Sequence, residues 1–501
     1  MKQSLAMTLL DSVQSLPDAS PYDRDAWQRG YRSLTSEFDY WIDDVEGHIP
    51  LELNGTLFRN GPGLMEINGQ RIHHPFDGDG MISAIAFQNG RAHFRNRYVR
   101  TEGYQAEQAA GQILYRGVFG TDKPGGWFAN ALDFKLKNIA NTNVIYWGGK
   151  LLALWEAAEP HRLDPTTLET VGLDYLDGVL APGDAFGAHP WVDPTGDNGQ
   201  PCLVNFSIKT GLSSTITLFE FALDGTLLRR YSQVVPGFCF MHDFAITPNY
   251  VIFFQNPVTF NPLPFLAGFR CAGECIQYHP EKKTRLILIP RAGKATTQQP
   301  LTLEMDSGFV FHHVNAFETG DRLTIDSICY ESLPEVAPDA DYRETDFSAV
   351  APGQLWRFTV DLTTGQIQRH QLDTRCCEFP TLHPAKVGQE HRYAYLAAAH
   401  APAGNAPHQA ICKLDLQTGD RQVWSAAPWG YVGEPVFIPR SELLTGAEDD
   451  GWIATVVFDG QRDRSDVVIL NAQTMQQEAR LHLKHHVPYG LHGFFTPECF
   501  V

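Results

Sequence analysis

Four histidines in strand-like segments are the residues best suited to metal chemistry. They are His189 in FGAHPWVD, His242 in FCFMHDFAIT, His312 in FVFHHVNAFE and His492 in PYGLHGFF. Successive members are 53, 70 and 180 residues apart, so equivalent strands of a repeated unit would bring four imidazoles together. Four neutral nitrogens without a thiolate suit iron, copper or zinc, and the imidazole count does not choose among these metals. For any one of them alone, a hydrogen-bonded core histidine is the ordinary interpretation.

The segment FVFHHVNAFE, residues 309–318, carries two adjacent histidines among β-branched and aromatic residues. Such a run predicts a β-strand, whose successive side chains point to opposite faces. His312 and His313 therefore cannot both serve one buried site. Four further histidines are predicted to lie in polar turns, where a histidine is ordinarily solvated: His161, His279, His370 and His408.

Three glutamates stand at the ends of apolar segments, where an unpaired charge is costly. They are Glu156 in LLALWEAAEP, Glu378 in RCCEFP and Glu434 in GYVGEPVF. A histidine that binds a metal usually donates its other ring N–H to a carboxylate. The alternative is that each glutamate merely reaches solvent from a strand end.

The elements that must position these residues are short alternating strands joined by polar turns. Seven such turns recur at separations of 54 to 75 residues, at Asn89, Asp164, Asp224, Pro290, Asp361, Asp415 and Asn471. A propeller blade is a small sheet that cannot bury its faces alone, so blades pack in a ring. We therefore predict an all-β fold, a seven-bladed β-propeller whose inner strands aim the histidines at the axis. The alternative, two packed β-sandwiches, would not require a common turn spacing.

Length, hydrophobic content, net charge and cysteine count limit the kind of protein that this chain can be. A chain of 501 residues with 43% hydrophobic residues can bury a large core. We expect an N-terminal extension over residues 1–25 and one domain over residues 26–501, because no Pro/Gly/Ser-rich linker divides the chain. The net charge of −19 and the lack of a basic stripe argue against a nucleic-acid partner. We expect a cytoplasmic location. The nine cysteines are an odd and sparse set that favours reduced thiols, no convincing signal peptide is found, and no stretch approaches 18 apolar residues.

Nine segments, in this order, resemble the carotenoid cleavage oxygenases: LNGTLFRNGPG, HPFDGDGM, LLALWE, AHP, MHDFAIT, FVFHHVNAFE, CEFP, GEPVF and PYGLHG. The resemblance runs from about residue 26 to the end. It implies a seven-bladed propeller with non-haem Fe2+ on its axis, under a cap of loops and short helices. The implied iron ligands are His189, His242, His312 and His492, and the implied carboxylate partners are Glu156, Glu378 and Glu434. The resemblance thus selects His312, and His313 becomes a packing or hydrogen-bonding residue.

The reaction implied by the resemblance is oxidative cleavage of a C=C bond. One Fe2+ per chain would leave positions open for O2, which adds across the central 15,15' bond of an apocarotenoid such as apo-8'-carotenal to give retinal and a second carbonyl product. No organic cofactor and no obligate protein partner are expected. The resemblance assigns Trp155, Phe240, Tyr330 and Phe379 to an apolar substrate tunnel and Thr142 to a place beside an open iron position. Core packing is the alternative for each of these aromatic residues.

Other activities remain open at this stage. Within the family these are cleavage of phenolic stilbenes and isomerisation of retinoids. Stilbene-cleaving members carry a lysine where this chain has Trp155, and an indole suits a polyene better. A propeller that binds a carotenoid without metal or catalysis is an alternative of another class. The sequence contains no Gly-x-Ser-x-Gly elbow, Walker loop or Gly-x-Gly-x-x-Gly, so hydrolase and nucleotide-binding functions find no support.

Two segments, residues 117–138 and 253–269, are unusually apolar for loops. The first contains Trp127 and Phe128 close to Lys135, and the second contains Phe265 and Leu266 among prolines. Apolar side chains beside lysines are typical of an element that lies at a membrane surface. We therefore expect peripheral membrane contact, through which an insoluble polyene would enter. The alternative is that both segments fold back as a lid over the tunnel.

Overall fold

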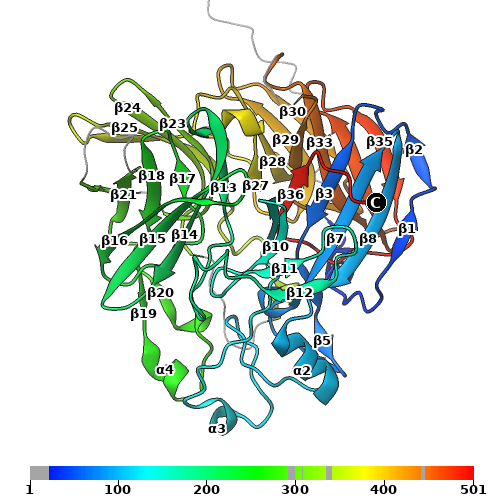
Figure 1. The fold of residues 1–501 in the computed structure, drawn as a ribbon, viewed down its shortest axis with the longest axis horizontal. Helices are drawn as coiled ribbons and strands as arrows, with labels where there is room; N and C mark the ends of the chain where they lie inside the picture. The colour runs from blue at the N-terminus through cyan, green and yellow to red at the C-terminus, as the bar shows by residue number, and fades with distance from the viewer. Residues whose placement is uncertain (1–21, 292–298, 307, 334–340, 442–445) are drawn as a thin grey trace, which may run out of the picture.

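Seven antiparallel β-sheets make up most of the computed structural model, which describes residues 22–291, 299–306, 308–333, 341–441 and 446–501. The sheets follow one another around the molecule in chain order, as the colours in Figure 1 show. We number them 1 to 7 in that order. The predicted class, an all-β propeller of seven blades, is confirmed.

Sheets 2 to 6 each consist of four strands, and in each sheet the strands pair in the order of the chain. Sheet 2 contains β9 (Asn143–Trp147), β10 (Lys150–Leu154), β11 (His161–Leu163) and β12 (Thr170–Leu173). Sheet 3 contains β13 (Trp191–Asp197), β14 (Gln200–Lys209), β15 (Ser213–Ala222) and β16 (Leu227–Pro236). Sheet 4 contains β17 (Ala245–Ile246), β18 (Tyr250–Gln255), β21 (Thr284–Pro290) and β22 (Leu301–Met305). Sheet 5 contains β23 (Phe309–Thr319), β24 (Arg322–Tyr330), β25 (Gln354–Asp361) and β26 (Ile367–Gln371), and sheet 6 contains β27 (Cys377–Thr381), β28 (Tyr393–Ala399), β29 (His408–Asp415) and β30 (Arg421–Ser425).

Sheets 1 and 7 close the ring by exchanging strands from the two ends of the chain. Sheet 1 joins the last strand, β36 (Gly493–Thr496), to β3 (Gly55–Arg59), β7 (Asp79–Gln88), β8 (Arg91–Tyr98) and β1 (Asp39–Trp41), with β4 (Pro62–Leu64) beside β7. Sheet 7 joins β31 (Gly430–Val432), β32 (Val436–Pro439), β33 (Gly451–Asp459), β34 (Arg464–Asn471) and β35 (Gln477–His482) to the early strand β2 (Val45–Gly47). Each closing sheet therefore combines early and late parts of the sequence.

The turns on which the blade count rested fall one in each sheet. Asn89, for example, separates β7 from β8, and Asp164 lies between β11 and β12. The weakest turn, at Pro290, begins at the last residue of β21, and residues 292–298 after it lie outside the described part of the chain. One turn per sheet confirms the repeat, and the alternative of two β-sandwiches is wrong.

Apolar side chains fill each boundary between neighbouring sheets. Seven hydrophobic clusters each span one pair of adjacent sheets, including the pair formed by sheets 7 and 1. In the cluster between sheets 3 and 4, for example, Val204 lies with Phe253 and Ile287, all no more than 2% exposed. Because both faces of each blade are covered in this way, the stability of each blade depends on its neighbours.

Three short helices and a hairpin form a cap at one end of the molecule (Figure 1). They are α2 (Glu102–Ala110), α3 (Trp127–Asn130) and α4 (Pro262–Leu266), with β19 (Val258–Phe260) and β20 (Ile276–Tyr278). The buried guanidinium of Arg116 joins the two predicted apolar segments, because it donates to the carbonyl oxygens of Asn130 (3.0 Å) and Phe265 (3.1 Å). No described helix is long and apolar enough to cross a bilayer.

The first described residues pack on sheet 7. Helix α1 (Arg24–Arg29) begins after Asp23, whose side chain accepts a hydrogen bond from the backbone N–H of Ala26 (2.7 Å), and Trp27 packs with Tyr431 and Phe458. Residues 1–21 of the expected N-terminal extension lie outside the described residues. The domain boundary after residue 25 stays a prediction.

Candidate metal centre

The four predicted ligand histidines meet at the inner ends of four sheets. His189 precedes β13, His242 precedes β17, His312 lies in β23, and His492 precedes β36. One ring nitrogen of each lies within 4.8 Å of those of the other three. Three of these residues are almost fully buried, with exposed fractions of 6 to 9%. Residues separated by as many as 303 positions in the chain thus form one compact cluster.

Strand β23 directs the two adjacent histidines apart, as predicted, although its register shifts between Val310 and His313 and again between His313 and Asn315. The Nδ1 atom of His313 lies 2.7 Å from Ser327 Oγ, and its ring packs edge-on against Phe254 with ring centroids 4.9 Å apart. Its backbone N–H donates to Asp243 Oδ2 (2.8 Å). Burial, and then the neighbouring His312, lower the pKa of His313 to about 3. His313 is therefore a neutral packing and hydrogen-bonding residue, and only His312 joins the cluster.

Three of the four imidazoles contact a carboxylate through Nδ1. The distances are 2.7 Å from His242 to Glu156, 2.6 Å from His312 to Glu378 and 2.8 Å from His492 to Glu434. An ionised carboxylate can only accept, so Nδ1 of each ring carries the hydrogen. Their Nε2 atoms therefore face the centre of the cluster, where each neutral ring offers a lone pair.

Imidazoles that converge in this way suit a bound cation. The Nε2 atoms of His189 and His242 are 2.9 Å apart, and Nε2 of His312 is buried without a hydrogen-bond partner among the described residues. Glu378 and Asp243 add buried negative charge beside the cluster. A transition metal ion bound by imidazoles would satisfy the nitrogens and offset this charge. The residues present therefore fit a metal, although donor type alone does not select iron.

The electrostatics of the cluster favour positive charge at its centre. Burial alone would lower the pKa of His312, but the carboxylate of Glu378 raises it to about 9. Burial would conversely raise the pKa of Glu378, but His312 lowers it to about 2. His189, which is buried beside three other imidazoles, has a pKa well below its ordinary value. Glu378 is therefore ionised at neutral pH.

Comparison with known proteins identifies the family. A profile described as retinal pigment epithelial membrane protein (RPE65) matches residues 31–497. The chain belongs to the RPE65 and carotenoid cleavage oxygenase family. It is 53% identical to the apocarotenoid-15,15'-oxygenase of a Synechocystis strain over 490 residues, which cover 96% of this chain and 99% of the relative. It is also 32% identical to the isoeugenol monooxygenase of Pseudomonas nitroreducens, over 92% of this chain and 95% of the relative.

A solved structure of a relative has the same fold. The crystal structure of cobalt-substituted Synechocystis apocarotenoid oxygenase superposes with a TM-score of 0.92 at 52% identity, and the match covers 95% of this chain and 99% of the other. The family resemblance in the sequence motifs is thereby confirmed over nearly the whole chain.

Two of the residues that the family resemblance assigns to the substrate tunnel, Phe379 and Tyr330, contact the histidine cluster or its carboxylate partners. The ring centroid of Phe379 is 5.8 Å from that of His312 and 5.4 Å from that of His492. Tyr330 donates its hydroxyl to Glu378 Oε1 (3.2 Å). The carbonyl oxygen of Thr142 accepts the backbone N–H of His492 (3.2 Å). The ring of Phe240 packs on Phe309, which packs on Phe311, and Phe311 packs on His242.

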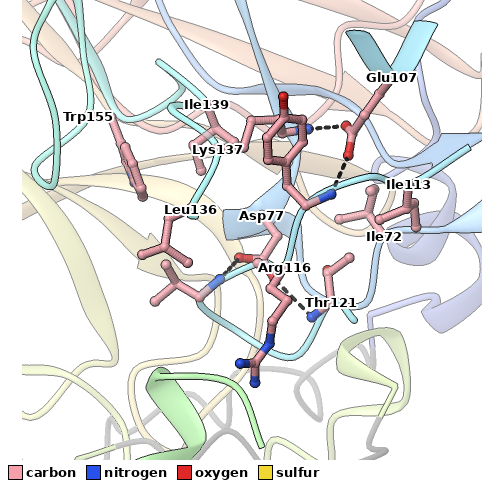
Figure 2. A pocket seen from close by; sticks show the side chains of 13 residues that line it. Ile72, Asp77, Glu107, Ile113, Arg116, Thr121, Leu136, Lys137, Ile139 and Trp155 are labelled. Atoms are coloured by element: carbon pink, nitrogen blue, oxygen red, sulfur yellow. Dashed lines mark hydrogen bonds and ion pairs between the residues drawn. The ribbon is translucent and has the colours of Figure 1, made fainter. Parts of the chain in front are cut away.

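Trp155 lies beside the cap. It lines a cavity of about 20 Å³ together with cap residues that include Leu136 and Lys137, as Figure 2 shows. Within this lining, Lys137 donates to Glu107 (2.6 Å). Such a volume holds about one water molecule. The next residue in the chain, Glu156, contacts His242 (2.7 Å).

Sequence reasoning missed Arg59 and Asp243, and it misplaced two histidines. Arg59 forms a buried ion pair with Glu434, and burial raises the pKa of Asp243 to about 6. Both are charged residues within motifs already recognised, and this was the signal that could have found them.

The expectation of solvated turns was wrong for His161, which is 4% exposed in β11, and for His408, whose ring centroid lies 6.3 Å from that of Phe379. Both histidines belong to strands whose edges resembled turns in the sequence.

Proposed function

We propose that this protein is a non-haem Fe2+ dioxygenase that cleaves the central 15,15' C=C bond of an apocarotenoid such as apo-8'-carotenal. Both atoms of O2 enter the products, which are retinal and a second carbonyl compound. The observation that carries the proposal is the convergence of four imidazole nitrogens backed by three carboxylates. It is supported by 53% identity to an apocarotenoid-15,15'-oxygenase over nearly the whole chain.

Each predicted site residue has a role in this proposal. The four histidines hold one Fe2+, which supplies binding and activation of O2. Glu156, Glu378 and Glu434 fix the orientation of three imidazoles and increase their basicity. Thr142 occupies the position beside an open iron site. The aromatic residues hold the polyene and exclude water: Trp155, Phe240, Tyr330 and Phe379.

Phe379 shows how the fold fixes one of these aromatic rings. Its φ angle is +49°, and the register of β27 shifts between Glu378 and Thr381. A left-handed conformation is unfavourable for a bulky residue and persists where the surroundings enforce it. Here the backbone N–H of Phe379 donates to Glu378 Oε2 (2.6 Å). In this conformation the ring of Phe379 packs against two of the proposed ligands, His312 and His492.

Removal and replacement of the metal test the proposal directly. We expect protein stripped with a chelator to lose apocarotenoid cleavage, and Fe2+ to restore it. Zn2+ should bind the same imidazoles without restoring activity, because it has no redox chemistry. Full activity of the zinc-loaded or metal-free protein would contradict the proposal.

Replacement of the carboxylates should weaken the metal centre without abolishing it. In Glu156→Gln, Glu378→Gln and Glu434→Gln, the amide oxygen still accepts the imidazole N–H but has no charge. We expect each variant to bind Fe2+ about 10- to 100-fold more weakly than the wild type, in a competition titration against a chelator. Unchanged affinity in all three would remove these glutamates from the proposed role.

The cap supports the proposed peripheral contact with a membrane. Its apolar side chains are largely exposed, including Phe128 (78%), Leu132 (70%), Leu263 (71%) and Phe269 (64%). The two segments form one surface, because the N–H of Leu132 donates to the carbonyl oxygen of Leu266 (3.0 Å). Burial of each such side chain in a bilayer contributes about 1.5 to 3 kcal/mol before ordering costs. A cytoplasmic enzyme with this surface would collect its polyene from the membrane.

Liposome flotation tests this contact. We expect the combined change Phe128→Ser, Leu132→Ser, Leu263→Ser and Phe269→Ser to abolish most flotation while turnover of detergent-dispersed substrate persists. A matched control changes four exposed apolar residues of the blades to Ser: Val171, Leu173, Leu212 and Leu223. Equal flotation of the cap variant and the control would instead favour the lid interpretation.

A further inference from the structure

Arg59 is a buried cation directly behind one of the proposed metal ligands. Its side chain is 6% exposed and lies at the end of β3. Nη1 is ion-paired with Glu434 Oε2, and Nη2 donates to the carbonyl oxygen of Leu491 (3.0 Å). A planar guanidinium can hold two acceptors in a fixed relative position, which an ammonium cannot do.

Three glycines make room for this guanidinium. A Cβ atom at Gly493 would lie 3.0 Å from Nη1, and a Cβ at Gly433 or Gly490 would lie 3.7 or 3.8 Å from Nη2. A side chain at Gly493 would therefore press on Arg59 and on the carbonyl oxygen of Phe58, whereas a Cβ at either of the other two positions would be in ordinary van der Waals contact with Arg59. The site is thus shaped around one arginine.

The contacts of Arg59 enclose the His492–Glu434 pair. Glu434 accepts from Arg59, from Nδ1 of His492 (2.8 Å) and from the backbone N–H of Gly493 (2.9 Å). The neighbouring Asn60 donates its N–H to the carbonyl oxygen of His492 (2.8 Å) and accepts the N–H of Leu491 at its own carbonyl oxygen (2.8 Å). The backbone on both sides of His492 is therefore fixed to the end of β3.

Arg59 also distinguishes this carboxylate from the other two. Glu434 forms a buried ion pair with Arg59. Glu378 instead accepts from the hydroxyl of Tyr330, and Glu156 is 27% exposed. Among the described residues, neither of these two forms an ion pair with a lysine or arginine.

We infer that Arg59 is a positioning residue of the metal centre, which fixes the place of the Glu434–His492 pair at the seam where the ring of blades closes. The inference rests on the proposed metal-binding function. Arg59 extends from sheet 1 to a carboxylate in sheet 7, and His492 directly precedes the closing strand β36. Metal binding and ring closure therefore share one buried ion pair.

A cobalt titration of Arg59→Met, Glu434→Gln and the double variant tests this inference. Co2+ reports the ligand geometry through its visible absorption, and a related oxygenase has been crystallised in a cobalt-substituted form. We expect Arg59→Met to bind Co2+ about 10- to 100-fold more weakly than the wild type and to shift its visible bands. The double variant should be no weaker than Arg59→Met alone, because residues acting through one pair are non-additive. Arg59→Lys should fall between the wild type and Arg59→Met.

Arg357→Met is the matched control. Arg357 binds the buried carboxylate of Asp326 through two hydrogen bonds of 2.7 Å, away from the four histidines. We expect this variant to lower the melting temperature and leave Co2+ affinity and absorption unchanged. If Arg59→Met does not fold, Arg59→Lys is judged by the same criteria.

The outcomes separate the two proposals. Failure of the wild type to bind Co2+ or Fe2+ would overturn the proposed function itself. Wild-type binding together with an unchanged affinity and spectrum in the Arg59 variants would overturn the inference alone. Additive effects of Arg59→Met and Glu434→Gln would also overturn it.

Discussion

Purified His312→Ala protein is expected to contain almost no iron and to show no cleavage activity, whereas His313→Ala keeps both. His312 offers Nε2 to the centre of the cluster and is held by Glu378 at 2.6 Å. Loss of a ligand should exceed the 10- to 100-fold effect of losing a carboxylate partner, so we expect a loss of affinity greater than about 100-fold. Iron content by mass spectrometry and turnover under air are the measurements.

His313→Ala controls for the loss of a buried histidine from the same strand. Its hydrogen bond to Ser327 and its packing on Phe254 are lost, so this variant should melt at a lower temperature but bind iron normally. Iron loss in His313→Ala together with retention in His312→Ala would reverse the ligand assignment.

Arg291→Met is expected to lower the free energy of unfolding by about 3 to 5 kcal/mol, because it leaves buried carboxylates short of a cation. Arg291 follows β21 in sheet 4, and its side chain is fully buried. It pairs with Glu220 at 3.1 Å and with Asp193, both in sheet 3. Glu220 retains Arg229 at 2.7 Å, which limits the loss. The midpoint of guanidinium unfolding reports the change.

An exposed ion pair supplies the control for this variant. Lys283 contacts Asp306 at 2.6 Å with both side chains more than half exposed. Because exposed pairs contribute little, Lys283→Met should change the free energy of unfolding by less than about 1 kcal/mol. Equal shifts for the two variants would show that burial does not govern the strength of these ion pairs.

The blade count could be predicted from the sequence because each blade repeats one local feature. Asp164 and Asp415, for instance, each accept backbone N–H groups within their own turns, so the signal lies within a few residues. Strand alternation similarly separated His312 from His313, because it depends only on backbone geometry.

Long-range contacts of the site could not be predicted in the same way. Arg59 and Glu434 are 375 positions apart, and nothing local to β3 indicates that its last side chain reaches another sheet. His408 was misread because a strand that starts inside the protein resembles a polar turn when its neighbours are Pro407 and Gln409. The exposure of the cap depends on how Arg116 joins two distant segments. The contact partners and the burial of such residues depend on tertiary packing. The sequence motifs indicate this packing only through their resemblance to a known family.

Mass analysis of the products formed from apo-8'-carotenal by the iron-loaded protein tests the central claim most directly. With O2 present, we predict retinal and one complementary dialdehyde in equal amounts, each carrying one oxygen atom from labelled O2, and no product without O2. Cleavage at a different double bond, or turnover that does not depend on O2, would contradict the account.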